Sequence, residues 1–203
     1  MTAYIWDLDG TLLDSYGVIV EGAARTAAEA GVHDNAGDVL KTVKQGTLSS
    51  YLNDVSRRSG VPSEQLMAQY RLYAHGLDDL ITLIDGAKET LEKLRDGGAV
   101  HFVYTHRGSS SGPILKRLGI QDCFREIVTS EYGFRLKPSG EGVQYLVEKY
   151  GLEPGQTWYV GDRTLDVFCA KDAGVRALLY LPPDSCVIAT GQEDRIVRDL
   201  REI

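Results

Sequence analysis

Short β-rich runs that alternate with helical patterns are the feature that most constrains the fold of this chain. The runs occupy residues 3–6, 100–105, 126–129, 157–160 and 177–181, and they are rich in aromatic and β-branched residues. Residues 87–95, before the second run, and residues 142–150, before the fourth, carry apolar positions three or four apart, as in an amphipathic helix. Strands that alternate with helices predict parallel βαβ units, and therefore an α/β protein with a three-layer, Rossmann-like parallel sheet.

The stretch from residue 14 to about residue 84 breaks this alternation, because it shows helical patterns and no convincing strand. Residues 22–30 are rich in alanine, and residues 49–59 carry apolar side chains at helical spacing. Ser63 is a plausible N-cap for a long helix over residues 64–83. We therefore predict a Rossmann-like catalytic core formed by residues 1–13 and 86–203, with an inserted all-helical cap domain formed by residues 14–85.

Two carboxylates, Asp7 and Asp9, stand at the end of the first β-rich run. Alternation along a strand points both side chains the same way, and two like charges this close repel unless a cation or a shared proton intervenes. A calcium loop is excluded, because Leu12 occupies its glycine position and Val18 its closing glutamate position. On these residues alone, a turn with solvated aspartates stays an open alternative.

Three later motifs also follow predicted strands. Thr105 ends the second strand and can offer a hydroxyl and a backbone N–H to an anion, and Lys137 in the loop after the third supplies a mobile positive charge. Asp162 and Asp166 follow the fourth strand. Ligands of open α/β sheets bind at the carboxyl ends of the strands, so we expect all four motifs to meet along one edge.

The series Asp7-Leu8-Asp9-Gly10-Thr11, Thr105, Lys137-Pro138 and Gly161-Asp162…Asp166 resembles the four motifs of the haloacid dehalogenase superfamily, over nearly the whole chain. The helical insert after the first motif resembles the C1 cap of its phosphoglycolate phosphatase and β-phosphoglucomutase relatives. The resemblance implies a Mg²⁺-dependent phosphatase that hydrolyses a small phosphorylated metabolite through an aspartyl-phosphate intermediate. A phosphosugar mutase is the alternative, although the cap-helix histidine of mutases has no counterpart in residues 16–22.

The resemblance also implies a catalytic role for four residues. Asp7 would be the nucleophile, and Asp9 would protonate the leaving alcohol and then deprotonate the hydrolytic water. Thr105 and Lys137 would bind the phosphoryl oxygens. A dehalogenase is disfavoured because those relatives lack a second catalytic aspartate like Asp9, and a non-catalytic binding module is disfavoured because no motif residue is missing.

The same resemblance implies a magnesium site made of oxygen ligands. The Asp7 carboxylate, the Asp9 backbone carbonyl and Asp162 would hold Mg²⁺, and Asp166 would support the site from nearby. A hard, oxygen-rich site suits this ion.

Three further residues are candidates for substrate binding. His106 and Arg107 follow Thr105, where relatives often carry Asn or a small residue, and they would reach a second anionic group on the substrate; a solvated loop is the alternative. Lys44 lies where the cap of relatives turns toward the active site, and a solvated helix end explains it equally well.

Charge and apolar content bound the partners and the compartment. The net charge of −7 argues against a general nucleic-acid binder, and no apolar run is long enough to span a membrane. The start of the chain carries no secretory signal pattern, and three cysteines without a CxxC pair predict reduced thiols. We therefore predict a cytoplasmic enzyme, a monomer or a homodimer, with no nucleic-acid or membrane partner.

Overall fold

The computed structural model describes residues 1–203, and these divide into two compact units. The core unit comprises Met1–Asp14 and Thr82–Ile203, and the helical unit comprises Ser15–Ile81. The sequence placed the two boundaries at 13/14 and 85/86. The structure has them at 14/15 and 81/82, because β2 (Leu13–Asp14) pairs antiparallel with β3 (Thr82–Leu83) and both strands belong to the core unit.

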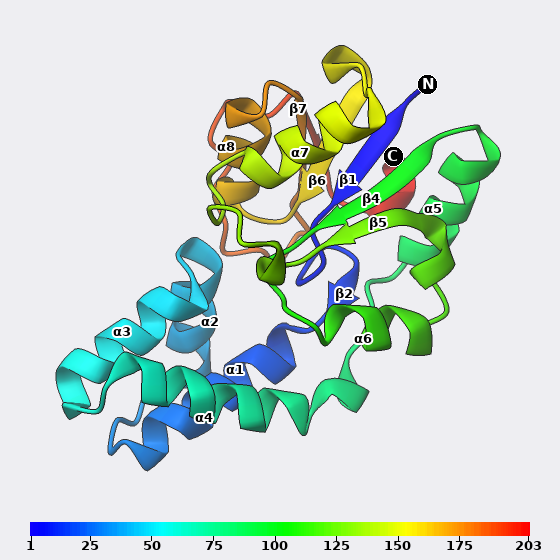
Figure 1. The fold of residues 1–203 in the computed structure, drawn as a ribbon. Helices are drawn as coiled ribbons and strands as arrows, with labels where there is room; N and C mark the ends of the chain where they lie inside the picture. The colour runs from blue at the N-terminus through cyan, green and yellow to red at the C-terminus, as the bar shows by residue number, and fades with distance from the viewer. The chain divides into compact units, whose positions relative to one another are not determined.

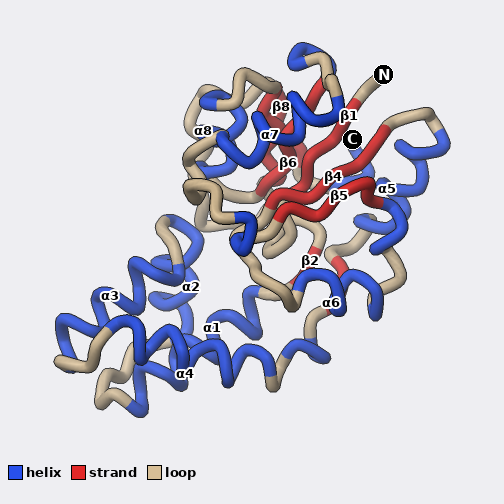
Figure 2. Tube along the Cα trace, in the orientation of Figure 1, coloured by secondary structure: helices blue, strands red, loops and turns tan.

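The core unit is built on a six-stranded parallel sheet in the order β5-β4-β1-β6-β7-β8, drawn in red in Figure 2. The strands are β1 (Ala3–Trp6), β4 (Val100–Tyr104), β5 (Phe124–Val128), β6 (Thr157–Gly161), β7 (Arg176–Tyr180) and β8 (Arg195–Val197). The predicted α/β class and parallel sheet are confirmed. β8 was missed, because three residues with two exposed side chains carry little strand signal.

Helices cover both faces of this sheet, which gives three layers (Figure 1). They are α5 (Ala87–Asp96), α6 (Ser111–Arg117), α7 (Glu141–Tyr150) and α8 (Thr164–Asp172). α7 and α8 pack on one face in a core that contains Ile5 and Phe102. On the other face, the His101 ring lies 3.1 Å from the carbonyl of Leu91 in α5. β1, buried on both faces, is therefore apolar throughout.

The helical unit contains α1 (Tyr16–Glu29), α2 (Ala36–Gln45), α3 (Leu48–Ser59) and α4 (Ser63–His75). All four helices contribute to one hydrophobic core, separate from that of the sheet. The all-helical character of the insert is confirmed. No helix of the chain is both long enough and apolar enough to span a membrane.

The predicted helix over residues 64–83 is wrong in its second half. α4 ends at His75, a 3₁₀ turn covers Asp78–Leu80, and the segment then becomes β3. Residues 82–83 form a strand because they find a partner in β2, a pairing that local sequence periodicity does not report. The predicted N-cap is also displaced by one residue, since Pro62 is the cap and Ser63 is already helical.

Candidate active site

The turn after β1 positions the first carboxylates. The backbone N–H of Asp7 donates to the carbonyl of Val160, which extends the β1–β6 ladder by one residue (2.8 Å). The Leu8 carbonyl then accepts hydrogen bonds from the N–H groups of three following residues, at 2.8–3.1 Å. Gly10 adopts φ 83°, a left-handed conformation that favours glycine. The chain therefore reverses directly after the strand and leaves Asp7 at its carboxyl end.

Three buried carboxylates meet at this edge of the sheet. Asp7, Asp162 and Asp166 each contribute an oxygen, and these oxygens lie within 4.8 Å of one another. Asp162 follows β6, and Asp166 lies in the first turn of α8, where its Oδ2 accepts the N–H of Arg163 at 3.0 Å. A Cβ on Gly161 would stand 2.3 Å from Cγ of Asp166, so glycine is needed for the two to approach.

Two buried cations stand among these carboxylates. Lys137 Nζ lies 2.7 Å from Asp166 Oδ1 and 2.9 Å from Asp7 Oδ1, and its side chain is 0% exposed. Burial alone would lower the pKa of the Lys137 ammonium, but Asp166 and Asp7 outweigh it and the pKa is raised. Arg163 Nη2 lies 3.5 Å from Asp7 Oδ2.

The ammonium of Lys137 is therefore held in place. The sequence-based expectation that Lys137 supplies a mobile positive charge is wrong on this point. Sequence reasoning gave Arg163 no role at all. The signal that could have found it was its place between Asp162 and Asp166 in a motif that falls directly after a strand.

Thr105 is buried at the end of β4, and only one of the two groups expected to bind an anion is available for that purpose. Its backbone N–H donates to the Val128 carbonyl at 3.0 Å, because the β4–β5 ladder continues past the strand. Its Oγ1 accepts the backbone N–H of Arg107 at 3.1 Å. The expectation that the backbone N–H binds an anion is therefore wrong, and the hydroxyl proton is the donor that Thr105 can offer.

Asp9, His106 and Arg107 form contacts within the core unit. Arg107 forms an ion pair with the Asp9 carboxylate. Its Nη2 lies 2.7 Å from Oδ1, and its Nε lies 3.1 and 3.3 Å from the two oxygens. His106 Nε2 accepts the backbone N–H of Lys137 at 2.8 Å. Burial, with the positive charges of Lys137 and Arg163, lowers the pKa of His106 to about 3, so the ring is neutral and can accept this bond.

Lys44 lies in α2 of the helical unit, where its ammonium stands 4.4 Å from the centroid of the Tyr16 ring. The structure therefore brings together the candidates of the core unit, while Lys44 belongs to the other unit. Its part in substrate binding stays a prediction.

The residues of the carboxylate cluster fit a divalent cation. All the donors of Asp7, Asp162 and Asp166 are carboxylate oxygens, the ligand type that Mg²⁺ prefers. Clustered carboxylates of like charge repel one another, so a divalent cation bound among these three would be stabilised.

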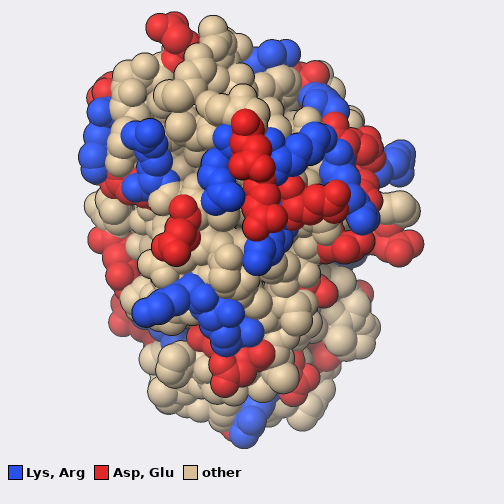
Figure 3. Space-filling view, turned by 90° about the vertical axis from the view of Figure 1, so that its right-hand side faces the viewer, with Lys and Arg blue, Asp and Glu red and all other residues tan.

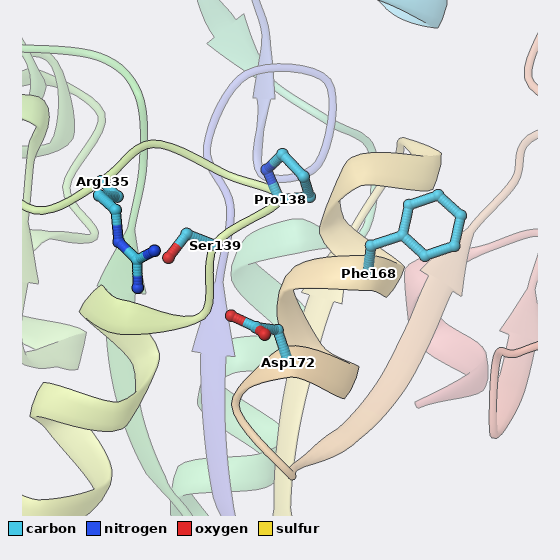
Figure 4. A pocket seen from close by; sticks show the side chains of 5 residues that line it. All are labelled: Arg135, Pro138, Ser139, Phe168 and Asp172. Atoms are coloured by element: carbon cyan, nitrogen blue, oxygen red, sulfur yellow. The ribbon is translucent and has the colours of Figure 1, made fainter.

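A pocket next to the Lys137 loop is lined by Arg135, Pro138, Ser139, Phe168 and Asp172, and none of the three clustered carboxylates lines it (Figure 4). On the face shown in Figure 3, Lys and Arg side chains are interspersed with Asp and Glu side chains and form no continuous basic surface.

The parallel sheet and the carboxylate cluster at the carboxyl ends of its strands together define a class of protein. They are typical of α/β enzymes with an acidic site at that edge of the sheet. A family model described as haloacid dehalogenase-like hydrolase matches residues 4–180. The chain belongs to this hydrolase family, as the resemblance of its four motifs implied.

Individual relatives are similar over most of their length. A phosphoglycolate phosphatase of Vibrio vulnificus (strain CMCP6) is 30% identical over 98% of this chain and 92% of its own. The pyrophosphatase PpaX of Bacillus velezensis is 28% identical over 87% of this chain and 81% of its own. Among solved structures, a putative haloacid dehalogenase-like hydrolase from Bacteroides fragilis superimposes with a TM-score of 0.88 at 23% identity, covering 99% of this chain and 98% of that one. That likeness supports the fold.

Proposed function

We propose that this protein is a Mg²⁺-dependent phosphatase that hydrolyses a small phosphorylated metabolite through an aspartyl-phosphate intermediate. One observation carries the proposal: the buried Asp7 carboxylate stands at the end of β1, paired with Lys137 and clustered with Asp162 and Asp166. Relatives named as a phosphoglycolate phosphatase and a pyrophosphatase support the reaction class.

In the first step a carboxylate oxygen of Asp7 attacks phosphorus, and the bond from phosphorus to the leaving oxygen breaks. An attack of one anion on another is opposed by repulsion, which the ammonium of Lys137, at 2.9 Å from Asp7 Oδ1, reduces. The Thr105 hydroxyl would donate a further hydrogen bond to a phosphoryl oxygen. Both groups are buried, so their charge and dipole act with little screening by water.

Asp9 would handle the proton in both steps. Protonated Asp9 gives its proton to the leaving alcohol, and the resulting carboxylate, which Arg107 stabilises, then takes a proton from the water that attacks the aspartyl-phosphate. The Asp9 side chain is partly exposed and is held by Arg107, outside the cluster of three carboxylates. This separation lets Asp7 and Asp9 carry out different tasks although they are two residues apart.

Asp7, Asp162 and Asp166, with the backbone carbonyl of Asp9, would hold the metal ion. When bound, the ion would supply positive charge that offsets the charge on the phosphoryl oxygens and on these carboxylates. Lys137 and Arg163 remain as fixed cations beside the same carboxylates.

We further infer that the helical unit acts as the cap that selects the substrate. The insertion of Ser15–Ile81 between the first two motifs supports this role, and Lys44 is the candidate contact. Phosphate release measured across sugar phosphates, phosphoglycolate and nucleotides, for the wild type and Lys44→Ala, would identify the substrate class. The cytoplasmic location and the monomeric or dimeric state expected from the sequence stay predictions.

The test of the intermediate uses two isosteric variants. Asp7→Asn should abolish covalent labelling and turnover together, because an amide does not attack phosphorus usefully. Asp9→Asn keeps its backbone carbonyl and loses the proton-transfer group, which should cost about 10²–10⁴-fold in turnover. With p-nitrophenyl phosphate, whose leaving group needs little acid help, Asp9→Asn should accumulate a phosphoenzyme about 80 Da heavier, the mass of HPO₃.

Rapid-quench intact-mass spectrometry measures this adduct. A labelled Asp7→Asn protein, or turnover of Asp9→Asn equal to that of the wild type, would show that the roles of the pair are wrongly assigned.

The metal site is tested by binding rather than by activity. Asp162→Ala removes one of three clustered carboxylates and should weaken Mg²⁺ binding by about tenfold or more, measured by isothermal titration calorimetry. Asp184→Ala, at an exposed position outside the cluster, is the matched control and should bind Mg²⁺ as the wild type does. Equal affinities in the two variants would remove Asp162 from the ligand set.

A further inference from the structure

We propose that His106 and Arg107 are positioning residues of the active site: His106 aligns Lys137, and Arg107 holds the Asp9 carboxylate. The inference rests on the proposed function, because it assigns the groups that the two residues align to the phosphoryl-binding and proton-transfer steps. It differs from the expectation that His106 and Arg107 contact the substrate directly.

His106 acts on the backbone of Lys137. Its Nε2 accepts the Lys137 N–H at 2.8 Å, across 31 positions of the chain, and ties the loop after β4 to the loop after β5. The Lys137 side chain is completely buried, with Nζ at 2.7–2.9 Å from the Asp166 and Asp7 carboxylates. Because packing surrounds the side chain, we expect a shift of the Lys137 backbone to change the distance between the ammonium and Asp7.

Arg107 acts on the side chain of Asp9. Three N···O distances of 2.7–3.3 Å involve both oxygens of the carboxylate, so the guanidinium fork fixes the orientation of the group and not only its charge. Arg107 Nη1 also lies 3.3 Å from Ser110 Oγ on the same loop, which steadies the guanidinium. The two side chains are only 10% and 17% exposed, so the pair is shielded from competing water.

One loop thus reaches two different motifs from adjacent positions. The backbone of the loop is itself fixed, since Arg107 N–H donates to Thr105 Oγ1 at 3.1 Å and the Arg107 carbonyl accepts the Ser130 N–H at 3.2 Å. A single rigid segment after β4 would therefore set the positions of Thr105, Lys137 and Asp9 together. This is the arrangement that precise catalytic geometry needs.

The proposed role of His106 is tested with two variants of this residue and with orthovanadate, an inert mimic of the phosphoryl group. His106→Leu removes the acceptor and should weaken orthovanadate binding by about 10²-fold, the effect expected of a misplacement near 1 Å. His106→Gln can place its Oε1 near the position of Nε2 and should restore most of that affinity. His33→Leu, at an exposed position of the helical unit, is the control and should leave it unchanged.

The proposed role of Arg107 is tested by a different measurement, the dependence of kcat/KM on the leaving group in a series of aryl phosphates. Arg107→Met releases the Asp9 carboxylate, so poor leaving groups should lose more rate than p-nitrophenyl phosphate, while orthovanadate affinity stays near that of the wild type. His106→Leu should show the reverse: weak orthovanadate binding with an unchanged leaving-group slope. Arg107→Lys keeps the charge but not the fork, and it should resemble Arg107→Met.

The outcomes separate this inference from the proposed function. Suppose that the wild type hydrolyses phosphate esters. The positioning role of His106 is then overturned if His106→Gln binds orthovanadate as weakly as His106→Leu. Both roles are overturned if His106→Leu and Arg107→Met change orthovanadate affinity and the leaving-group slope in the same way. If the wild type hydrolyses no phosphate ester, the proposed function fails. Two activity-free measurements then decide the inference: calorimetric binding of orthovanadate to the His106 variants, and the melting temperatures of Arg107→Met, Asp9→Asn and the double variant. If the losses in melting temperature of the two single variants add up to that of the double variant, the interaction between Arg107 and Asp9 is refuted.

Discussion

At the scale of single residues, the site is defined by how buried charges are paired. Lys137 and Arg163 stand beside Asp7, so the nucleophile candidate is flanked by positive charge supplied by the protein itself. Asp9 has its own partner in Arg107. A buried charge without a partner is costly, so this pairing explains how the chain tolerates Asp7 and Asp9 at this edge of its sheet.

The imidazole of His101 is also buried, but it is accommodated in its neutral form rather than as a paired charge. The His101 side chain is 1% exposed, accepts the Trp6 Nε1–H at Nδ1 (3.1 Å) and has Nε2 3.1 Å from the Leu91 carbonyl. An Nε2–H tautomer satisfies both contacts. Burial lowers the pKa of His101 to about 4 from its ordinary 6.5.

This shift predicts a loss of stability in mild acid. Between pH 6.5 and 4 the unfolded chain binds a proton at His101 that the folded protein does not, so the contribution is complete above pH 6.5 and is lost as the pH falls toward 4. The full effect is about 3 kcal/mol of unfolding free energy. Urea denaturation of the wild type and of His101→Phe at several pH values measures it.

The slope of unfolding free energy against pH should be shallower in His101→Phe, by up to about 1.4 kcal/mol per pH unit. Parallel curves for the wild type and His101→Phe would mean that His101 titrates normally in the folded protein.

At the scale of secondary structure elements, contact between a helix and a strand depends on a missing side chain. Gly142 in α7 lies over Tyr104 in β4, and a Cβ on the glycine would stand 2.4 Å from Cε2 of the tyrosine ring. Tyr104 is itself fixed, because its hydroxyl donates to the Arg135 carbonyl at 3.1 Å. α7 therefore approaches the sheet more closely than an alanine would allow.

Gly142→Ala should destabilise the protein although alanine is the better helix former. Overpacking costs about 1–3 kcal/mol, and a Cβ placed 2.4 Å from a ring atom calls for the upper part of that range, which exceeds the gain of about 1 kcal/mol in helix propensity. Gly155→Ala, with no atom within 4 Å of the added Cβ, should change the unfolding free energy little. Denaturant unfolding of both variants checks this, and a Gly142→Ala protein as stable as the wild type would contradict the tight packing.

At the scale of the whole molecule, the chain builds two cores from one sequence. One core lies between the sheet and helices α7 and α8, and the other lies among the four helices of the insert. The strands β2 and β3 pair beside the two points where the chain passes from one unit to the other. Each unit buries its own apolar residues, so substitutions inside one core need not disturb the other.

The sequence by itself determined the fold class and the positions of the motifs. Strand and helix periodicity is local, and parallel strands align their carboxyl ends, so these two rules suffice to place Asp7, Lys137, Asp162 and Asp166 on one edge of the sheet. Local patterns also predicted an inserted helical segment.

Only the tertiary structure decided how these groups are paired and oriented. It placed Lys137 in full burial between two carboxylates, committed the Thr105 backbone N–H to the sheet, and turned residues 82–83 into a strand. It also assigned Arg107 to Asp9 and brought Arg163 beside Asp7. Each of these contacts joins residues far apart in the chain. Their energies depend on distance and burial in the folded protein, quantities that a local sequence pattern does not contain.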